Sequence, residues 1–441
     1  MLPNANARDF IRFAAQSPTA FQAIREISAR LEENGFRHLA EENISEIAPG
    51  GKYYFTRNQS SLIAFEISEK GFAPFQIAAS HSDSPMFRLK SSFEEIVCDK
   101  YLRLNVEGYG GMLMSTWLDR PLSVAGRVVV RDGNRLRGQL VDLERDALVI
   151  PNVPIHMQRN VNDGYAWNIQ KDLLPLYGGE NSKGALTREI AEKLNVRPED
   201  IVSHDLYLYC RTPGSVWGDN GMYFSSPRID NLECAYTSLL GFLSAEDNGM
   251  THVLAVFDNE EVGSGTRQGA DSHFLSDALE RVADGLGASR GELHSALAGS
   301  FMLSADNAHA VHPNHPELYD ADNRTWMNGG VVIKHSANQK YTTDAVSDAL
   351  FSEICRRAEI PTQHFANRSD LKGGSTLGNI SGTQVSIPTV DIGLAQLAMH
   401  SAYETAGTRD LPWMAEAMKA FFSTPMKLCE SEIFLGEMSR M

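Results

Sequence analysis

The chain has 441 residues, of which 42% are hydrophobic and 22% charged, a composition typical of a globular protein and not of a disordered one. Because single hydrophobic cores stop growing at roughly 250–300 residues, this length predicts two domains. Lys and Arg number 40 against 56 Asp and Glu, and the formal charge of −16 disfavours nucleic acid and anionic membrane surfaces as partners.

Cysteine usage and the N-terminal segment favour a reducing, intracellular setting. The five cysteines are scattered and form no CxxC pair, so neither a disulfide framework nor a thiolate zinc site is indicated. Arg8, Asp9 and Arg12 interrupt the apolar run that a signal peptide needs. No segment approaches the roughly 18 apolar residues of a membrane span. We therefore expect a cytoplasmic protein that binds neither membranes nor nucleic acid.

The chain changes character twice, which predicts one domain inserted into another. Up to about residue 90, a helix precedes two core strands, and from about 227 apolar strands alternate with helices, as in an α/β sheet covered on both faces. Between about 92 and 226 the pattern is β-rich, with a hairpin turn expected at Asp132-Gly133. The expected core strands of the α/β part are 61–67, 75–80, 252–258, 300–306 and 389–395.

The segment after Asp230 predicts an amphipathic helix. Its apolar residues recur at helical spacing and form one stripe, which indicates packing against a sheet and not a binding function. The stripe consists of Leu232, Ala235, Tyr236, Leu239, Leu240 and Leu243.

Acidic and histidine residues stand where three of the predicted strands end. In open α/β sheets, ligands bind at the carboxyl ends of the strands, so these positions can converge on one pocket. With two further residues they provide two imidazoles and three carboxylates, a set suited to one or two divalent first-row metals, zinc first. The candidate ligands are His81, Asp230, Glu261, Asp306 and His400.

Two further carboxylates have candidate catalytic roles beside these ligands. Glu260 and Glu261 are adjacent, so at a strand end they point in different directions, and one can bind metal while the other moves protons. Glu260 would take a proton from a metal-bridging water and deliver it to a leaving amine. Asp83 lies two residues after His81 and could orient its imidazole.

Each of these residues has a plainer interpretation when taken alone. A histidine after a strand is more often a structural group than a ligand, and a Glu-Glu pair is usually a solvated surface. Asp306 could form a turn, and Asp230 could cap the helix that follows it. The metal-site hypothesis rests on their joint occurrence.

Six segments resemble the M18 metallopeptidases, the aspartyl aminopeptidase family, and among them the bacterial members. These segments occur in order and span nearly the whole chain. They are HSDSP (81–85), RIDN (228–231), DNEEVGS (258–264), SADNAHAVHPN (304–314), GGSTLG (373–378) and QLAMHS (396–401).

The resemblance implies a dinuclear zinc aminopeptidase that acts on peptides, with Glu260 as the general base and Asp230 as the bridging ligand. It also implies an α/β fold in which a zinc-exopeptidase-like catalytic domain, with a mixed sheet flanked by helices, covers residues 1–91 and 227–441. A β-rich dimerisation domain would interrupt it over residues 92–226, and dimers would build a dodecamer. The metal ligands would be His81, Asp230, Glu261, Asp306 and His400, each binding zinc, for which Mn²⁺ or Co²⁺ can substitute.

Further residues match family positions in and around the substrate pocket. Lys334 would pair with an acidic substrate side chain, since a single ammonium suits one carboxylate, whereas the plain alternative is an exposed lysine. His156 would reach a neighbouring subunit's site, as a substrate or metal contact, or is an ordinary loop histidine. His309 and His312 could line the pocket or orient ligands. Gly374 belongs to a glycine run whose backbone N–H groups could hold a peptide.

Lys334 favours acidic N-terminal residues, with neutral residues as the alternative. A peptide-binding scaffold without turnover would carry a damaged site, and here all ligand and base positions are filled. A serine hydrolase is disfavoured because the chain lacks a G-x-S-x-G elbow.

Overall fold

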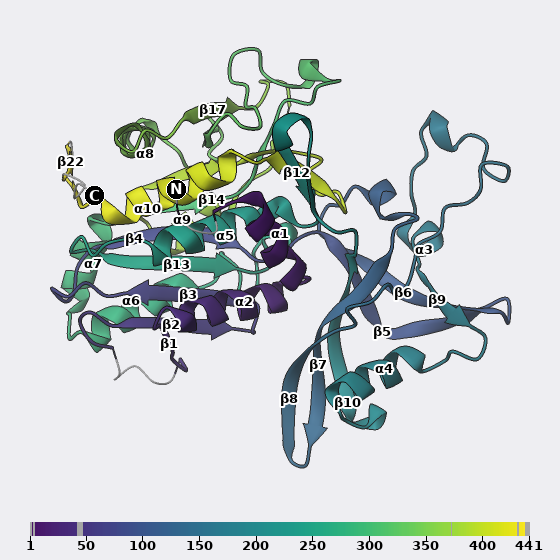
Figure 1. The fold of residues 1–441 in the computed structure, drawn as a ribbon. Coiled ribbons are helices and arrows are strands. Elements are labelled where there is room, and N and C mark those ends of the chain that lie inside the picture. Colours follow the sequence, from purple (N-terminus) through teal and green to yellow (C-terminus); the bar gives the residue numbers. More distant parts are fainter. Residues whose placement is uncertain (1, 3–4, 42–46, 372, 430–431, 437–441) are drawn as a thin grey trace.

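A nine-stranded mixed sheet forms the centre of the larger, α/β lobe of the molecule (Figure 1), in the order β1-β2-β3-β13-β4-β14-β18-β16-β17. This computed structural model describes residues 2, 5–41, 47–371, 373–429 and 432–436. The central strands β13, β4, β14 and β18 run parallel, and β3 and β16 run antiparallel to them on either side. The strands are β1 (Arg37–His38), β2 (Lys52–Arg57), β3 (Ser61–Glu66), β4 (Phe75–His81), β13 (Thr251–Phe257), β14 (Phe301–Ala305), β16 (Val331–His335), β17 (Thr362–Ala366) and β18 (Thr389–Gly393).

Helices cover both faces of this sheet, because the central strands are apolar on both sides. Along β13, Leu254 packs into the core on one face, whereas Val253 and Ala255 pack into the core on the other. The first face carries α1 (Ala7–Gln16), α2 (Ala20–Glu33), α5 (Ile229–Leu243), α8 (Ala345–Arg357) and α10 (Asp410–Ser423). The second face carries α6 (Phe274–Gly285), α7 (Arg290–Ala298) and α9 (Leu377–Gln384).

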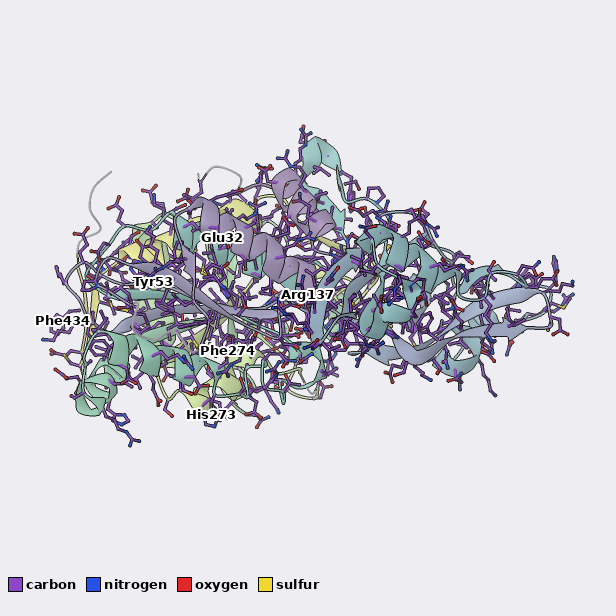
Figure 2. All side chains as sticks on the ribbon, turned by 90° about the horizontal axis from the view of Figure 1, so that it is seen from below. Glu32, Tyr53, Arg137, His273, Phe274 and Phe434 are labelled. Atoms are coloured by element: carbon purple, nitrogen blue, oxygen red, sulfur yellow. The ribbon has the colours of Figure 1, made fainter. Side chains whose placement is uncertain are left out.

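A six-stranded antiparallel sheet forms the second, β-rich lobe, in the order β8-β7-β10-β5-β6-β9, with its own apolar core. Seen from below, this narrower lobe extends away from the broad lobe that holds Tyr53 and Phe274 (Figure 2). Its elements are β5 (Met86–Val97), β6 (Tyr101–Tyr109), β7 (Leu122–Asp132), β8 (Arg135–Asp142), β9 (Leu176–Gly179), β10 (Ile201–Cys210), α3 (Ile169–Asp172) and α4 (Ala185–Leu194).

The predicted hairpin joins β7 to β8, but its turn lies one residue later than expected. Asp132 pairs with Arg135, so the two loop residues are Gly133 and Asn134 and not Asp132-Gly133. Gly133 takes a φ of 61°, in the left-handed region that a tight two-residue turn requires. Glycine therefore sits at the first loop position, and Asp132 ends the strand.

A third sheet of five short strands joins the two lobes, in the order β11-β12-β20-β19-β15. Its strands are β11 (Ser215–Trp217), β12 (Tyr223–Ser226), β15 (Ala308–His309), β19 (Ala395–Leu397) and β20 (Glu404–Gly407), and β21 (Met426–Leu428) pairs separately with β22 (Ile433–Leu435). β11 and β12 fall within 92–226, yet they extend the sheet of β20 and not the β-rich lobe. The β-rich sheet thus covers 86–210, and the division into two domains stays a prediction.

The helix predicted after Asp230 is α5, and its start depends on Arg228. Arg228 takes a left-handed φ of 58°, and its guanidinium donates to the backbone oxygens of Ser17 and Ala14 at the end of α1. α5 then packs closely on α10, because a Cβ on Gly241 would lie 2.2 Å from the Cβ of Met418. Within the described ranges, no helix combines the length and apolar character needed to cross a membrane.

We predict that Gly241→Ala separates α5 from α10 and lowers the free energy of unfolding by about 1–3 kcal/mol, the usual cost of overpacking. Gly382→Ala is the matched control, since Gly382 lies in α9 with nothing within 4 Å of its would-be Cβ. Alanine there should stabilise the helix by about 0.5–1 kcal/mol. Thermal unfolding of both variants measures the difference, and equal midpoints would contradict the close packing.

Candidate metal centre

The carboxyl ends of β13, β4 and β14 meet at one edge of the large sheet, because these neighbouring strands are parallel. His81 is the last residue of β4, and Asp306 follows the last residue of β14. Glu260 and Glu261 lie in a single 3-10 turn (Glu260–Val262) that begins three residues after β13 ends. The three strands therefore deliver their polar residues to the same place.

Asp230 and His400 reach this place from the five-stranded sheet. Asp230 lies in the first turn of α5, shortly after β12, and its φ of −78° and ψ of 112° are not helical. His400 lies between β19 and β20 with a left-handed φ of 67°. The Nδ1 atom of His400 contacts the backbone oxygen of Gly111 at 2.5 Å, so the ring turns its Nε2 toward Asp230.

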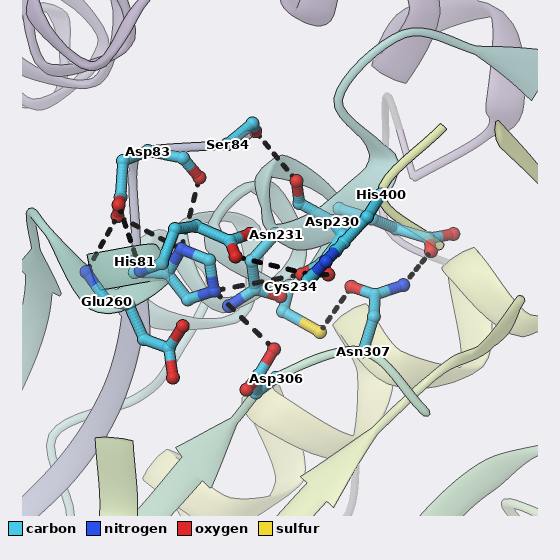
Figure 3. Close-up of polar contacts among 12 residues, drawn as sticks. His81, Asp83, Ser84, Asp230, Asn231, Cys234, Glu260, Asp306, Asn307 and His400 are labelled. Atoms are coloured by element: carbon cyan, nitrogen blue, oxygen red, sulfur yellow. Dashed lines mark hydrogen bonds and ion pairs between the residues drawn. The ribbon is translucent and has the colours of Figure 1, made fainter. Parts of the chain in front are cut away.

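Asp230 stands between His81 and His400 (Figure 3) and belongs to two groups of candidate ligands. Its Oδ1 lies 3.7 Å from Nε2 of His81, which is itself 3.5 Å from Oδ1 of Asp306. Its Oδ2 lies 3.3 Å from Nε2 of His400, which is also 3.3 Å from Oε2 of Glu261. One carboxylate thus offers a different oxygen to each group.

The five residues fit divalent cations in spacing and in donor type. In tetrahedral sites with bonds of about 2.0–2.1 Å, ligand atoms lie about 3.3 Å apart, close to the separations found here. Asp230 Oδ1 and Glu261 Oε1 are buried and accept no hydrogen bond from any residue that the structure describes. A helix cap would have such a bond, so the plain interpretation of Asp230 is disfavoured.

The electrostatics of the centre also favour bound cations. Burial and the charge of Asp230 raise the pKa of Glu261 well above its usual value. Burial, with the charge of Asp306 adding to it, raises the pKa of Glu260 to about 8. Burial works against a charged His400, but contact with Asp230 outweighs it and raises the pKa of His400 to about 9. Without a cation the centre retains protons, which metal binding would displace.

Asp83 fixes both His81 and the turn that carries the two glutamates. Nδ1 of His81 lies 3.2 Å from Asp83 Oδ1 and 3.1 Å from the Asp83 backbone oxygen, which leaves Nε2 for a metal. The N–H groups of Glu260 and Glu261 donate to the two carboxylate oxygens of Asp83, each at 3.2 Å. The Glu260 carboxylate points toward His81 and Asp306 and forms no hydrogen bond or ion pair with the residues shown in Figure 3. It lies within reach of His81 and Glu261, with which it forms a further potential ligand group.

Glu404 was missed by the sequence analysis, although it holds two of the candidate ligands. It is buried at the start of β20, and its Oε1 accepts from the N–H of His400 at 2.8 Å. Its Oε2 accepts from the N–H of Asp230 at 3.1 Å. Its position four residues after His400 could have indicated a contact with that histidine. The contact with the N–H of Asp230 could not be predicted, because Asp230 lies far away in the sequence.

The β-rich lobe also supports the centre, through residues that the sequence analysis did not single out. The Tyr109 hydroxyl, at the end of β6, donates to Asp83 Oδ2 at 2.6 Å and accepts from the side chain of Asn259. Gly110 follows with a φ of 73°, and a Cβ there would lie 3.1 Å from the Cβ of Glu261. A close approach of the two lobes therefore requires glycine at this position.

Lys334 is buried and not exposed, in contrast to the plain interpretation of a surface lysine. Among the described residues it is the one lysine or arginine in the buried class, with 2% of its surface exposed. Its Nζ donates to the backbone oxygens of Asp306 at 2.7 Å and Asn307 at 3.3 Å. Burial tends to raise the pKa of Asp306, but the charges of Lys334 and His81 outweigh it and lower that pKa to about 2.

The structure does not bring the other predicted residues into the ligand groups. His309 is exposed beside the ring of Phe365, and Nδ1 of His312 accepts from the N–H of Asn314 in its own loop. His156 is exposed on a loop of the β-rich lobe. Gly374 has nothing within 4 Å of a would-be Cβ.

Comparison with known proteins places the chain in a family. The family described as Aminopeptidase I zinc metalloprotease (M18) matches residues 13–422. A probable M18 family aminopeptidase 2 of Clostridium acetobutylicum is 45% identical over 426 residues, which cover 95% of this chain and 98% of that protein. The protein of the same name from Ectopseudomonas mendocina is 37% identical over 94% of this chain and 97% of its own length.

Solved structures of the family share the fold. A structure of the Ape4 and Nbr1 complex contains a chain that matches with a TM-score of 0.90 and 33% identity, over 95% of this chain and 85% of that one. The Saccharomyces cerevisiae mApe1 dodecamer matches with a TM-score of 0.83 and 27% identity, over 94% of this chain and 95% of that one. The predicted fold class, a mixed sheet flanked by helices and interrupted by a β-rich part, is confirmed. The chain belongs to the M18 family of zinc metalloproteases and is a metalloaminopeptidase.

Proposed function

We propose that this aminopeptidase is dinuclear and that Asp230 bridges its two zinc ions. His81 and Asp306 would complete one site, and Glu261 and His400 the other. The proposal rests on one observation, that Asp230 directs Oδ1 toward His81 and Oδ2 toward His400, at 3.7 and 3.3 Å. Mn²⁺ or Co²⁺ would accept the same nitrogen and oxygen ligands.

Glu260 is the general base of the proposed reaction. When bound, the two ions polarise the scissile carbonyl and lower the pKa of the attacking water. Glu260 accepts a proton from that water as its oxygen attacks the carbonyl carbon, and then delivers the proton to the leaving amine when the C–N bond breaks. Asp83 holds the backbone of Glu260 and the ring of His81, so both keep their orientation during the proton transfers.

We predict that Glu260→Gln lowers kcat by about 10²–10⁴-fold, because the amide cannot carry the proton. Zinc content should stay at the wild-type value, since Glu260 is not among the proposed ligands. Glu280→Gln, on an exposed position of α6, is the matched control and should retain full activity. Near-normal turnover of Glu260→Gln at full zinc occupancy would show that the base is another residue.

Asp230→Ala gives the contrasting result, because it removes a ligand and not the base. We expect this variant to lose zinc together with activity, whereas Asp284→Ala at an exposed position of α6 should lose neither. Metal analysis after dialysis distinguishes the two classes of variant. An unchanged zinc content of Asp230→Ala would exclude the bridging role.

We predict that Glu404→Gln weakens zinc binding by about 10–100-fold, the usual effect of losing a group that orients a ligand. Two backbone N–H groups and the Gln396 side-chain amide donate to Glu404, and glutamine keeps only one acceptor oxygen, so the backbone of Asp230 or of His400 loses its partner. Activity should recover as free zinc is raised, which a loss of catalytic groups would not allow. A zinc titration of activity that matches the wild type would rule out this positioning role.

The proposed substrates are peptides with Asp or Glu at the free N-terminus. An acidic side chain needs a cation in a dry pocket, and Lys334 is a buried cation next to Asp306. Its ammonium has three donors, of which two are used by backbone oxygens, so one remains for a substrate carboxylate. His309, His312 and Gly374 follow the same strands and loops and are proposed pocket residues.

We predict that Lys334→Ala lowers kcat/KM about 10–100-fold more for Asp- and Glu- than for Leu-aminoacyl chromogenic substrates. Lys340→Ala, an exposed lysine of the following loop, serves as the control. An equal loss on all substrates would mean that Lys334 only supports the Asp306 loop. If the wild-type enzyme instead prefers the Leu substrate and a chelator abolishes its activity, the metal mechanism is supported and the acidic pocket is excluded.

A homo-oligomer, built from dimers into a dodecamer, is the proposed assembly. The yeast relative is a dodecamer by its description. The loop that carries His156 exposes Val153, Ile155 and Met157, with 82% of Met157 accessible in the single chain. A neighbouring subunit would cover these apolar side chains, and His156 would then reach its site. The free cysteines are compatible with the proposed cytoplasmic location.

A further inference from the structure

A second group of potential ligands, separate from those around Asp230, lies where α8 stands beside β17 (Figure 1). It consists of His335 at the end of β16, His364 in β17 and Asp348 in the first turns of α8. Among the described residues, it is the one such group that shares no member with the catalytic centre. The proposed aminopeptidase mechanism does not use it.

The side-chain alternation of the two strands brings the histidines to the same face. Ile333 belongs to the core that α8 also enters, whereas Val332 and Phe365 belong to a separate core on the opposite face. His335 is two residues after Ile333, and His364 pairs with Ile333 across the strands, so both imidazoles face α8. Lys334 therefore points the other way, toward Asp306.

α8 places a carboxylate over these two imidazoles. Its buried stripe runs from Ser347 through Phe351 to Cys355, and the partly buried Asp348 lies at the edge of that stripe, three residues before Phe351. The side chain of Asp348 is 22% exposed, and Ser352 donates to its Oδ1 at 2.8 Å. An acidic residue thus stands at the edge of the helix face that packs on the sheet.

The three side chains converge as ligands of one ion would. Nε2 of His335 lies 3.2 Å from Oδ2 of Asp348, and Nε2 of His364 lies 3.2 Å from Oδ1 of the same carboxylate. The three ligand atoms lie within 4.8 Å of one another. Ligand atoms around tetrahedral zinc are about 3.3 Å apart, so small rotations suffice to enclose an ion. The histidine side chains are 34% and 47% exposed, which leaves a side open to water.

We propose that His335, Asp348 and His364 form a further zinc-binding site, with water completing the coordination. Two imidazoles and one carboxylate suit Zn²⁺ better than Mg²⁺ and Ca²⁺, which prefer oxygen ligands. A bound ion connects α8 to the two outer strands of the sheet. Hydrogen bonds from neutral histidines to Asp348 are the competing interpretation of the same distances.

Zinc binding to the full-length protein distinguishes the two interpretations. After dialysis against buffered free zinc, His335→Gln, His364→Gln and Asp348→Asn should each bind one equivalent fewer than the wild type. His294→Gln, at an exposed position of α7, is the control and should bind the wild-type amount. Because the comparison uses a difference, it does not depend on how many ions the catalytic centre holds. Unchanged stoichiometry in the three variants would overturn the proposal.

A second measurement avoids substitutions altogether. Diethyl pyrocarbonate modifies accessible imidazoles, and peptide mapping of the wild-type protein reports each histidine separately. Zinc should slow the modification of His335 and His364 and leave that of His294 unchanged. If His335 and His364 are modified at the same rate with and without zinc, the three side chains form hydrogen bonds only and bind no ion. Either negative result is sufficient to reject the site.

Discussion

The accumulation of buried carboxylates around Asp230 is the constraint on which the rest of the structure depends. Asp230, Glu261 and Asp306 approach one another at the edge of the sheet, with Glu260 beside them. Two of their oxygens lack hydrogen bonds within the described chain. Burying such charges without compensation costs several kcal/mol each, so the centre is stable either with protons retained or with cations bound. A bound cation removes this cost, so burial of the carboxylates favours metal binding.

The surrounding structure is arranged to hold these charges in place. Glu404 fixes the backbone of Asp230 and His400, and Asp83 fixes His81 and the turn with both glutamates. Neither carboxylate is a proposed ligand, yet each connects segments that are far apart in the sequence. The β-rich lobe contributes through Tyr109 and the backbone of Gly111, so the two lobes build one centre together. Displacement of either lobe would therefore shift the positions of the candidate ligands.

The sequence predicted the parts of this arrangement that follow from local pattern. Apolar strands that end in His81 or Asp306 predicted a common edge, because parallel strands in an α/β sheet share their direction. Glu404 and Tyr109 could not be found in this way, since Asp230, a partner of Glu404, and Asp83, the partner of Tyr109, each lie more than 20 residues away. The hairpin was misplaced by one residue because both Asp132-Gly133 and Gly133-Asn134 suit a tight turn. Lys334 was assigned by resemblance, and its burial became visible only when β16 was placed inside the sheet.

Burial also explains why the two proposed groups of metal ligands should differ in affinity. In the proposed catalytic centre, Asp230 and Glu261 each have a buried oxygen that accepts no hydrogen bond from the described residues, so a cation relieves an existing cost. At the outer strands, Asp348 already accepts from Ser352, faces two imidazoles and lies in the first turns of a helix, where the dipole stabilises a negative charge. An ion there must replace contacts that are already favourable and partly exposed to water. The outer site should therefore fill only after the catalytic centre, as free zinc rises.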